Sequence, residues 1–500
     1  MTRPGDVPMP ATADGTTVAE ALADAVDGIR LNRPHLSASV AFVPWQKWSL
    51  VALLVVVVVG LVLATTGTLT VLAAIATTAY VATIIDRVVL FRRGLATGPI
   101  RVSDGAARAV ADDALPNYTV LVPAYDEPEV VGGLVAAMES LDYPREKLQV
   151  LLLLEEDDDV TITAAADVIS SGAVTLLLVP AAKPRTKPKA CNFGLHFATG
   201  DIVTIYDAED VPDPLQLRRV AVAFDSLDDD VACIQARLDF HNSGDNVLTA
   251  WFTADYGLWF GFLLPGLMAS RSPIPLGGTS NHLRRRVFDE IGAWDPFNVT
   301  EDADLGIRIA VHGMRTAVLD STTWEEANID AINWIRQRSR WYKGYLQTFL
   351  VHMRSPVTVA RTLGPVGTFR LATLFAGTPL IACLNVAFWF MLAVWVLGQP
   401  TEITRILPPA IYYPSLVSMI LGNSATVYMT LIAIREDDRP ELFWPALIVP
   451  FYWVLMGIAA VKGTWQLLRN PSYWEKTAHG IGSSTAQPTP PPVPAPGPGT

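Results

Sequence analysis

The feature that most constrains the fold of this chain is a long apolar stretch near its beginning. Residues 49–85 contain no Asp, Glu, Lys or Arg. A transmembrane helix needs about 20 predominantly apolar residues, so residues 45–93 have the length for two spanning helices, with a tight turn at 65–68. Basic residues flank the stretch on both sides and none lies in the turn. This pattern predicts that both ends face the cytoplasm.

Further apolar stretches occupy the second part of the chain, between residues 366 and 468. Residues 371–396 and 411–434 each have the length and composition of a span. A third stretch, 442–461, is interrupted by two prolines. Two spans return the C-terminus to the cytoplasm, whereas three leave it outside. We predict four spans in total, with 442–468 interfacial or re-entrant, because basic residues favour a cytoplasmic end: Lys462, Arg469 and Lys476.

Between the apolar stretches, residues 94–330 have the alternating pattern of a soluble α/β domain. Short apolar runs that predict strands alternate with segments that predict helices. This alternation is typical of a mostly parallel sheet with helices on both faces. The strands are expected at residues 118–123, 148–154, 174–179 and 201–206.

Clusters of acidic residues follow two of these predicted strands. Residues 155–159 are all acidic, and Asp207, Glu209 and Asp210 follow the last of the four strands. The carboxyl ends of parallel strands meet at one edge of a sheet, where ligands of open α/β sheets bind. Carboxylates at that edge suit a hard divalent cation that is shared with substrate phosphates. The alternative reading is a solvated acidic turn.

The ends of the chain and its net charge narrow the range of functions. Residues 1–44 are polar and contain several prolines, which predicts a disordered cytoplasmic arm with one short helix at 18–29. Residues 469–500 form a cytoplasmic tail, Pro-rich and disordered towards its end. The net charge of −12 disfavours a nucleic-acid partner. The three cysteines lie far apart, which predicts neither a disulfide framework nor a zinc site.

Residues 331–365 begin with a basic and aromatic amphipathic helix. Such a helix commonly lies on a membrane surface. A DNA-binding helix has the same residue types, but the acidic chain and the neighbouring apolar stretches argue against it.

Four short motifs follow one another in this chain, and together they resemble a known family. The motifs are an acidic strand end, an Asp-x-Asp variant, a Thr-Glu-Asp element and a Gln-x-x-Arg-Trp element, at residues 155–157, 207–210, 300–302 and 337–341. In this order, between apolar stretches, they resemble the membrane-embedded family 2 glycosyltransferases of the cellulose synthase, chitin synthase and hyaluronan synthase type. The resemblance covers residues 118–345.

The resemblance implies a fold and an activity. The fold is an α/β GT-A-like (Rossmann-like) cytoplasmic domain inserted between transmembrane helices of a multi-pass protein in the inner (plasma) membrane. The activity is that of an inverting, processive enzyme that transfers sugar from a UDP-sugar to a growing β-linked polysaccharide. The polysaccharide would pass through the enzyme's own helices across the lipid bilayer, and the resemblance leaves room for a secretion partner protein.

The resemblance also implies roles for the acidic residues. Asp207 and Glu209 would hold Mg²⁺ or Mn²⁺, which stabilises the leaving diphosphate, with Asp210 as a rival for the second ligand. The family usually has Asp where this chain has Glu209. Asp302 would be the general base that takes the proton of the acceptor hydroxyl. The alternative for Asp302 is that residues 300–302 only cap the helix expected at 303–312.

The remaining candidate residues bind the two substrates. A basic stretch leading into a helix suits phosphate binding, and it resembles the family's Lys-Ala-x-x-Asn element. The nucleotide-sugar candidates are Glu155, Asp157, Lys187, Lys189, Asn192 and Arg340. The acceptor candidates are Gly278, Thr279, Gln337 and Trp341, of which the tryptophan would stack on the acceptor sugar. The alternative is a solvated loop for Lys187, Lys189 and Asn192, and an interfacial helix for Arg340 and Trp341.

Other functions stay open at the level of the sequence. Residues 473–480 loosely resemble the gating loop that closes over the nucleotide in cellulose synthases. A single-transfer enzyme that glycosylates a lipid carrier would share the metal site but need no channel. An inactive membrane scaffold of a secretion complex is a third reading, supported only by glutamates at 155 and 209.

Overall fold

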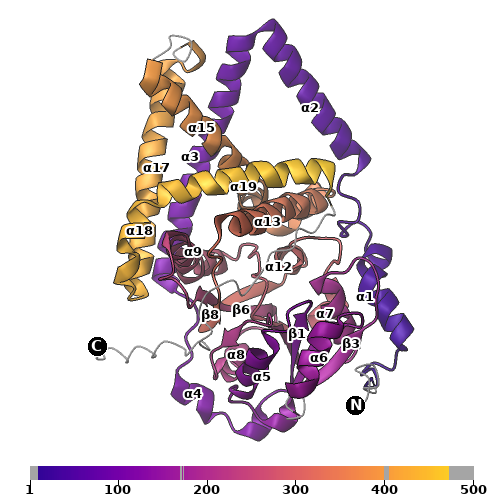
Figure 1. Ribbon diagram of the computed structural model, residues 1–500. Coiled ribbons are helices and arrows are strands. Elements are labelled where there is room, and N and C mark those ends of the chain that lie inside the picture. Colours follow the sequence, from indigo (N-terminus) through magenta and orange to yellow (C-terminus); the bar gives the residue numbers. More distant parts are fainter. Residues whose placement is uncertain (1–8, 169–171, 173, 399–404, 472–500) are drawn as a thin grey trace.

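The computed structural model describes residues 9–168, 172, 174–398 and 405–471. An α/β domain forms one end of the molecule, and long helices extend from its other end (Figure 1). The helices come from both sides of the domain in the sequence, as the positions of the apolar stretches predicted.

The centre of the domain is an eight-stranded sheet with the order β3-β2-β1-β4-β7-β6-β8-β5. The neighbours β3, β2, β1 and β4 are parallel, β7 is antiparallel to β4 and β6, and β8 is parallel to β6. The last strand, β5, is antiparallel to β8. The carboxyl ends of all strands except β7 and β5 therefore lie at one edge. The bounds are β1 Tyr118–Ala124, β2 Leu148–Glu155, β3 Thr175–Val179, β4 Ile202–Ile205, β5 Val211–Pro212, β6 Val231–Phe240, β7 Asn281–Arg284 and β8 Arg315–Glu325. All four strands predicted from the sequence are present.

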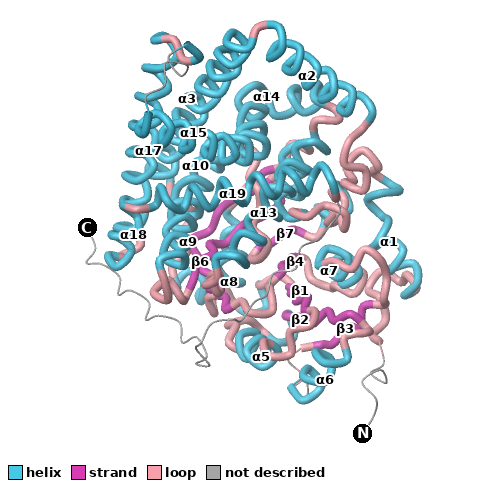
Figure 2. The backbone as a smooth tube through the Cα atoms, turned by 45° about the horizontal axis from the view of Figure 1, so that its top comes forward, coloured by secondary structure: helices cyan, strands magenta, loops and turns pink. Residues whose placement is uncertain are grey.

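Helices cover both faces of the sheet, because alternate residues of each strand point to opposite faces. Val120 and Leu152 face a layer of α5 (Val131–Glu139), α6 (Asp159–Val168) and α8 (Gln216–Ser226). Leu121 and Leu153 face the opposite layer, whose helices are α1 (Val18–Asn32), α7 (Lys187–Leu195), α11 (Arg286–Ile291) and α12 (Glu301–Val311). Figure 2 shows α5 and α6 on one side of the strands and α7 on the other. Short helical turns complete the domain: α4 Asp104–Ala109, η2 Asp112–Ala114 and η3 Arg145–Lys147.

The N-terminal segment is part of this domain. The predicted helix is present as α1, and a Thr17–Glu20 capping box fixes its start. Ala21 and Ala25 have no exposed surface and join the core on the α7 side of the sheet. The prediction of a disordered arm is therefore wrong for residues 9–44, because the small side chains of α1 bury a face that the polar composition concealed.

Several helices are long and apolar enough to cross a membrane. By length and composition, five qualify among the described residues, or six if one bent pair counts as a span. They include α2 (Pro44–Leu63) and α3 (Thr65–Thr97), α14 (Pro356–Ala372) with η6 (Thr373–Gly377) and α15 (Thr378–Gly398), and α17 (Pro409–Glu436). Ala64 alone separates α2 from α3, so residues 65–68 begin α3 and do not form the predicted turn.

One of the five apolar helices lies inside the protein. It consists of α9 (Val247–Leu258), the π-helical turn η5 (Trp259–Leu263) and α10 (Leu264–Ala269). The most apolar stretch of 18 residues in this helix is 72% buried. Its glycines allow close packing on α3, since a Cβ on Gly266 would lie 2.1 Å from the carbonyl oxygen of Leu90. This helix joins the domain to α3, and the sequence did not predict it.

Two helices cross above the carboxyl edge of the sheet. The basic, aromatic stretch forms α13 (Ala331–His352), and α19 (Val449–Arg469) runs across it (Figure 1). A Cβ on Gly463 of α19 would lie 2.5 Å from the carbonyl oxygen of Ser339 in α13. The segment η7 (Pro440–Leu442) with α18 (Phe443–Leu447) meets α19 at an angle of 64°. Protein therefore covers much of the α13 surface that was predicted to face a membrane.

Candidate functional site

Four predicted site residues meet at the carboxyl edge of the sheet. Asp207 follows β4, and its Oδ1 accepts a hydrogen bond from the ammonium group of Lys187, the first residue of α7. Lys187 Nζ also donates to the carbonyl of Gly278 at 2.8 Å. A Cβ on Gly278 would lie 3.5 Å from Asp302 Oδ2 and 3.8 Å from Lys187 Nζ. Glycine at this position therefore leaves open the space between the cation and the two carboxylates.

Asp210 holds the loop after β4 in shape. Its Oδ2 accepts hydrogen bonds from the backbone N–H of Asp207, at 2.7 Å, and from the Thr279 hydroxyl. Thr279 is 1% exposed and also donates to the carbonyl of Ile205. Its predicted role as an acceptor contact is replaced by support of the acidic loop. The other carboxylate oxygen of Asp210 is buried without a partner among the described residues.

Carboxylates are in excess at this edge. Glu325 ends β8, on the same edge as Asp207, and was not predicted as a site residue. Burial, followed by repulsion from Asp210, Asp207 and Glu209, raises the pKa of Glu325 well above its usual range. Burial and the Asp207 charge likewise raise the pKa of Asp210. Such mutual repulsion is the setting in which a bound cation is most stabilising.

The carboxylate set fits a metal that the substrate helps to hold. In the described part of the chain, no three His, Cys, Asp or Glu side chains converge as a complete metal site. A divalent cation can be held by one or two carboxylates together with substrate phosphates. Asp207 and Glu209, both partly exposed after β4, fit that arrangement, and the orphaned oxygen of Asp210 lies behind them.

Asp302 and Glu301 form the first turn of α12. Burial raises the pKa of Asp302 to about 6, while its hydrogen bond from the Ala303 N–H and the Lys187 charge act in the opposite direction. Burial and the neighbouring Asp302 raise the pKa of Glu301 to about 8, and Arg340 of α13 opposes this shift. A carboxylate with a pKa near 6 is deprotonated at neutral pH and still basic enough to accept a proton. Asp302 thus has the electrostatics of a general base.

The residues after β2 divide into an interior pair and an edge cluster. Lys189 has no exposed surface and donates to Glu155 Oε2 at 2.7 Å. This ion pair joins α7 to β2 inside the protein, and a nucleotide contact of either residue stays a prediction. Asp157 instead lies at the surface and pairs with Arg185, which donates to the Tyr125 hydroxyl at 2.7 Å and lies over its ring. The cluster of Asp157, Arg185 and Tyr125 could contact a nucleotide. Of these three residues, the sequence predicted only Asp157.

Asn192 links three segments of backbone. Its Nδ2 donates to the carbonyls of Ala25 in α1 and Trp294, at 3.2 and 2.8 Å, and its Oδ1 accepts from the Trp294 N–H. The side chain is buried. Its amide therefore holds α1 against the loop that precedes α12, and its contact with the nucleotide stays a prediction.

The acceptor candidates of α13 lie beside a buried guanidinium. Trp341 is partly exposed, and the Arg338 guanidinium carbon lies 4.6 Å from the centre of its ring. Arg338 pairs with Asp255 of α9 at 3.0 Å and donates to the Tyr452 hydroxyl of α19 at 3.0 Å. Gln337 accepts a hydrogen bond from Asn328 at 3.0 Å, which ties the start of α13 to the loop after β8.

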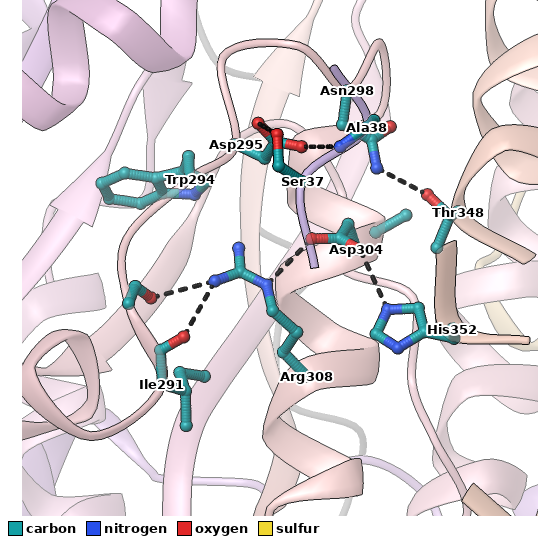
Figure 3. A network of polar contacts seen from close by, with 12 residues as sticks. Ser37, Ala38, Ile291, Trp294, Asp295, Asn298, Asp304, Arg308, Thr348 and His352 are labelled. Atoms are coloured by element: carbon teal, nitrogen blue, oxygen red, sulfur yellow. Dashed lines mark hydrogen bonds and ion pairs between the residues drawn. The ribbon is translucent and has the colours of Figure 1, made fainter. Parts of the chain in front are cut away.

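A network of matched charges supports α12 from its other side (Figure 3). Asp304 is completely buried and pairs with Arg308 at 2.8 Å and with His352 of α13 at 2.9 Å. Arg308 also donates to the carbonyl of Ile291. Asp295 accepts a hydrogen bond from the N–H of Ala38, and this bond attaches the N-terminal segment to the same network. These contacts fix the helix on which Asp302 lies.

One further sequence prediction falls outside the structure. The segment 473–480, which resembles a gating loop, lies outside the described residues.

Comparisons with known proteins identify glycosyltransferases as relatives of this chain. Residues 116–344 match the family model described as "Glycosyltransferase like family 2". The chain is 26% identical over 242 residues to the probable glycosyltransferase YdaM of Bacillus subtilis, which covers 46% of this chain and 55% of that protein. It is 27% identical over 387 residues to a β-monoglucosyldiacylglycerol synthase of Synechocystis sp., covering 74% of this chain and 76% of that enzyme. The chain thus spans little more than half of the first relative's length.

A solved structure shares the fold. The mannosyltransferase PcManGT of Pyrobaculum calidifontis, in complex with GDP-Man and Mn²⁺, aligns with a TM-score of 0.50 and 18% identity. The alignment covers 80% of this chain and 99% of that chain. At this identity the likeness shows the fold alone. It confirms the predicted GT-A-like fold.

Proposed function

Because residues 116–344 form a family 2 glycosyltransferase domain, which uses nucleotide sugars, we propose that this protein is an inverting, metal-dependent enzyme that transfers one sugar from a UDP-sugar to a lipid in the membrane. The observation that carries the catalytic part is the convergence of Lys187, Asp207 and Asp302 around the open space at Gly278. That space lies at the carboxyl edge of the sheet, where both substrates can meet.

Each residue of the site has a role in the proposed reaction. Asp302 accepts the proton of the acceptor hydroxyl as this oxygen attacks the anomeric carbon and the nucleoside diphosphate leaves. Lys187, and Arg340 near Glu301, supply positive charge for the leaving diphosphate. Asp207 and Glu209 would hold Mg²⁺ or Mn²⁺, which neutralises charge on the diphosphate when bound. Asp157 with Arg185 and Tyr125 is the proposed contact for the uracil base.

The arrangement of the apolar helices supports a lipid acceptor. A channel for a polysaccharide needs helices on all sides, because sugar hydroxyls in contact with hydrocarbon lose their hydrogen bonds. In α2, all of which the structure describes, Gln46 is the single buried residue. Figure 1 shows α2 leaning away from α3 and from the helices that follow the domain. An open bundle of this kind suits an acceptor that enters sideways from the bilayer, and the Synechocystis relative is named as a β-monoglucosyldiacylglycerol synthase.

Polymer synthesis is the second candidate. The partly exposed ring of Trp341 on α13 favours it, because a tryptophan beside the site can stack on the terminal sugar of a growing chain. This reading keeps the processive activity implied by the four motifs, with passage across the membrane and a secretion partner as further requirements.

The products of the full-length protein in lipid vesicles decide between the two candidates. The protein is incubated with Mg²⁺ or Mn²⁺ and a panel of labelled UDP-sugars, with GDP-mannose as an alternative donor. We expect label in the organic phase as one product of one added sugar, lost on chelation and in Asp302→Asn but kept in Asp289→Asn, an exposed control on α11. A ladder of water-soluble products would establish the polymerase instead. Binding of UDP without release from any donor would favour the inactive scaffold.

A further inference from the structure

The interior between the domain and the apolar helices contains more positive than negative charge. Arg338 of α13 is 11% exposed and forms its ion pair with Asp255 of α9. Arg87 of α3 lies near the same carboxylate and near Tyr342 of α13. Two guanidinium groups therefore lie near one carboxylate, and only Arg338 forms an ion pair with it.

Arg87 is aimed into this interior by the helix that carries it. Thr77 of α3 contacts Ser415 of α17 at 2.7 Å, and the Tyr80 hydroxyl donates to Asn423 at 3.2 Å. Ile84 faces the same helix, since a Cβ on Gly422 would lie 2.1 Å from its Cδ1. The spacing 77, 80, 84 and 87 marks one face of a helix. Arg87 thus continues the face of α3 that packs on α17 and does not point to the surrounding lipid.

The donor groups of the two arginines are not all used. In the part of the chain that the structure describes, the buried Nε–H groups of both Arg87 and Arg338 have no acceptor. Nor does a described carboxylate lie within ion-pairing distance of Arg87. Arg87 is partly exposed, but its Nε–H is shielded from water without an acceptor, which is costly for a cation. A phosphate bound by the guanidinium would remove that cost through strong, charge-assisted hydrogen bonds.

We propose that Arg87, together with Arg338 and Tyr342, binds the phosphate group of the acceptor lipid beside Trp341. The inference rests on the proposed lipid acceptor and adds its chemical class, a phospholipid whose headgroup carries a free hydroxyl in addition to its phosphate. The phosphate would sit between α3, α9 and α13, with the acyl chains extending through the open side of the bundle next to α2. The hydroxyl to be glycosylated would then point down towards Asp302.

An equilibrium binding measurement without donor tests this site. Full-length protein in a neutral detergent is titrated with fluorescent phosphatidic acid and with fluorescent diacylglycerol of the same chains, read by anisotropy. We expect phosphatidic acid to bind at least about tenfold more tightly than diacylglycerol. Arg87→Met should abolish that preference, Arg87→Lys should retain part of it, and Arg92→Met, an exposed position one turn further along α3, should leave it unchanged.

Each contrary result has a defined meaning. Equal affinity for the two lipids in the wild-type protein, or an unchanged preference in Arg87→Met, overturns the phosphate site. Displacement of the lipid by millimolar inorganic phosphate would assign the site to a soluble anion and overturn the lipid assignment. Unchanged UDP binding by Arg87→Met shows that the variant is folded. Phosphate-dependent binding without sugar transfer would contradict the proposed function alone, whereas transfer to diacylglycerol without a phosphate preference would contradict this inference alone.

Discussion

Asp302 and Asp304 lie two residues apart on α12, and their surroundings differ in charge balance. Asp304 is completely buried between Arg308 and His352, and these charges lower its pKa against the effect of burial. Asp302 faces Glu301, Asp207 and the space at Gly278, and burial raises its pKa to about 6. The matched side holds the helix in place, and the unmatched side leaves a carboxylate ready to accept a proton. A single helix thus separates a stabilising cluster from a reactive one.

The largest effect on activity should come from removing the Asp302 carboxylate. In Asp302→Asn, we expect the transfer rate to fall by about 10²–10⁴-fold, the usual contribution of a general base. UDP binding and the unfolding midpoint should stay close to wild type, because the variant removes a repelling charge and leaves no ion unpaired. Single-turnover transfer and thermal unfolding measure the two properties. A folded, UDP-binding variant with the full rate would exclude Asp302 as the base.

Removal of Asp304, in contrast, should lower the stability of the protein. Asp304→Ala leaves the buried guanidinium of Arg308 without its anion, and we expect the free energy of unfolding to fall by about 3–5 kcal/mol. The paired variant Asp304→Leu with Arg308→Met, which removes both members of the ion pair, should recover most of this loss. Denaturant titration in detergent measures the free energy of unfolding of each variant. If the single and the paired variants are equally unstable, charge balance is not what this cluster provides.

The pH dependence of the two carboxylates should have opposite signs. Asp302 is protonated below about pH 6, so the transfer rate should fall about tenfold for each pH unit below that value. A raised pKa in the folded state also means that the stability contributed by Asp302 is present below its unfolded pKa and is lost as pH rises through about 6. Asp304, whose pKa is lowered, contributes stability above its unfolded pKa that is lost as pH falls through the folded one.

Unfolding midpoints between pH 4 and pH 8 check these signs. Asp302→Asn should reduce the loss of stability on raising the pH, and Asp304→Asn should reduce the loss on lowering it. Equal slopes in both variants and the wild type would contradict the assigned pKa directions.

The smallest effect should come from loosening the N-terminal segment, residues 33–40, next to the cluster of Asp304, Arg308 and His352. Arg354 donates to the carbonyls of Pro34, His35 and Ser37 at 3.0–3.2 Å. We expect Arg354→Met to lower the free energy of unfolding by about 1–2 kcal/mol and to expose residues 33–40 to proteolysis. Arg361→Met, an exposed arginine of α14, is the matched control. Unchanged protection of the segment would show that Arg354 does not hold it.

The sequence predicted the elements whose patterns are local. The four parallel strands, α1, α13 and the apolar helices all have a periodicity that is independent of their neighbours. The acidic residues after β4 were also predicted, because the carboxyl ends of parallel strands meet by rule. The start of α12 was predicted through the resemblance of residues 300–302 to the family motif. Glu325 obeys the same rule at the end of β8, and recognising that strand would have found it.

Tertiary structure decided which polar residues gather at the edge of the sheet and which are buried elsewhere. Lys187 and Lys189 are separated by one residue, yet the first reaches Asp207 and the second is buried against Glu155. Asn192 looked like a ligand contact and instead holds α1, and a polar N-terminal segment joined the core through two alanines. Residue type and spacing determine what chemistry a side chain can perform. Its partners depend on contacts between segments far apart in the chain, and only the folded structure brings those together.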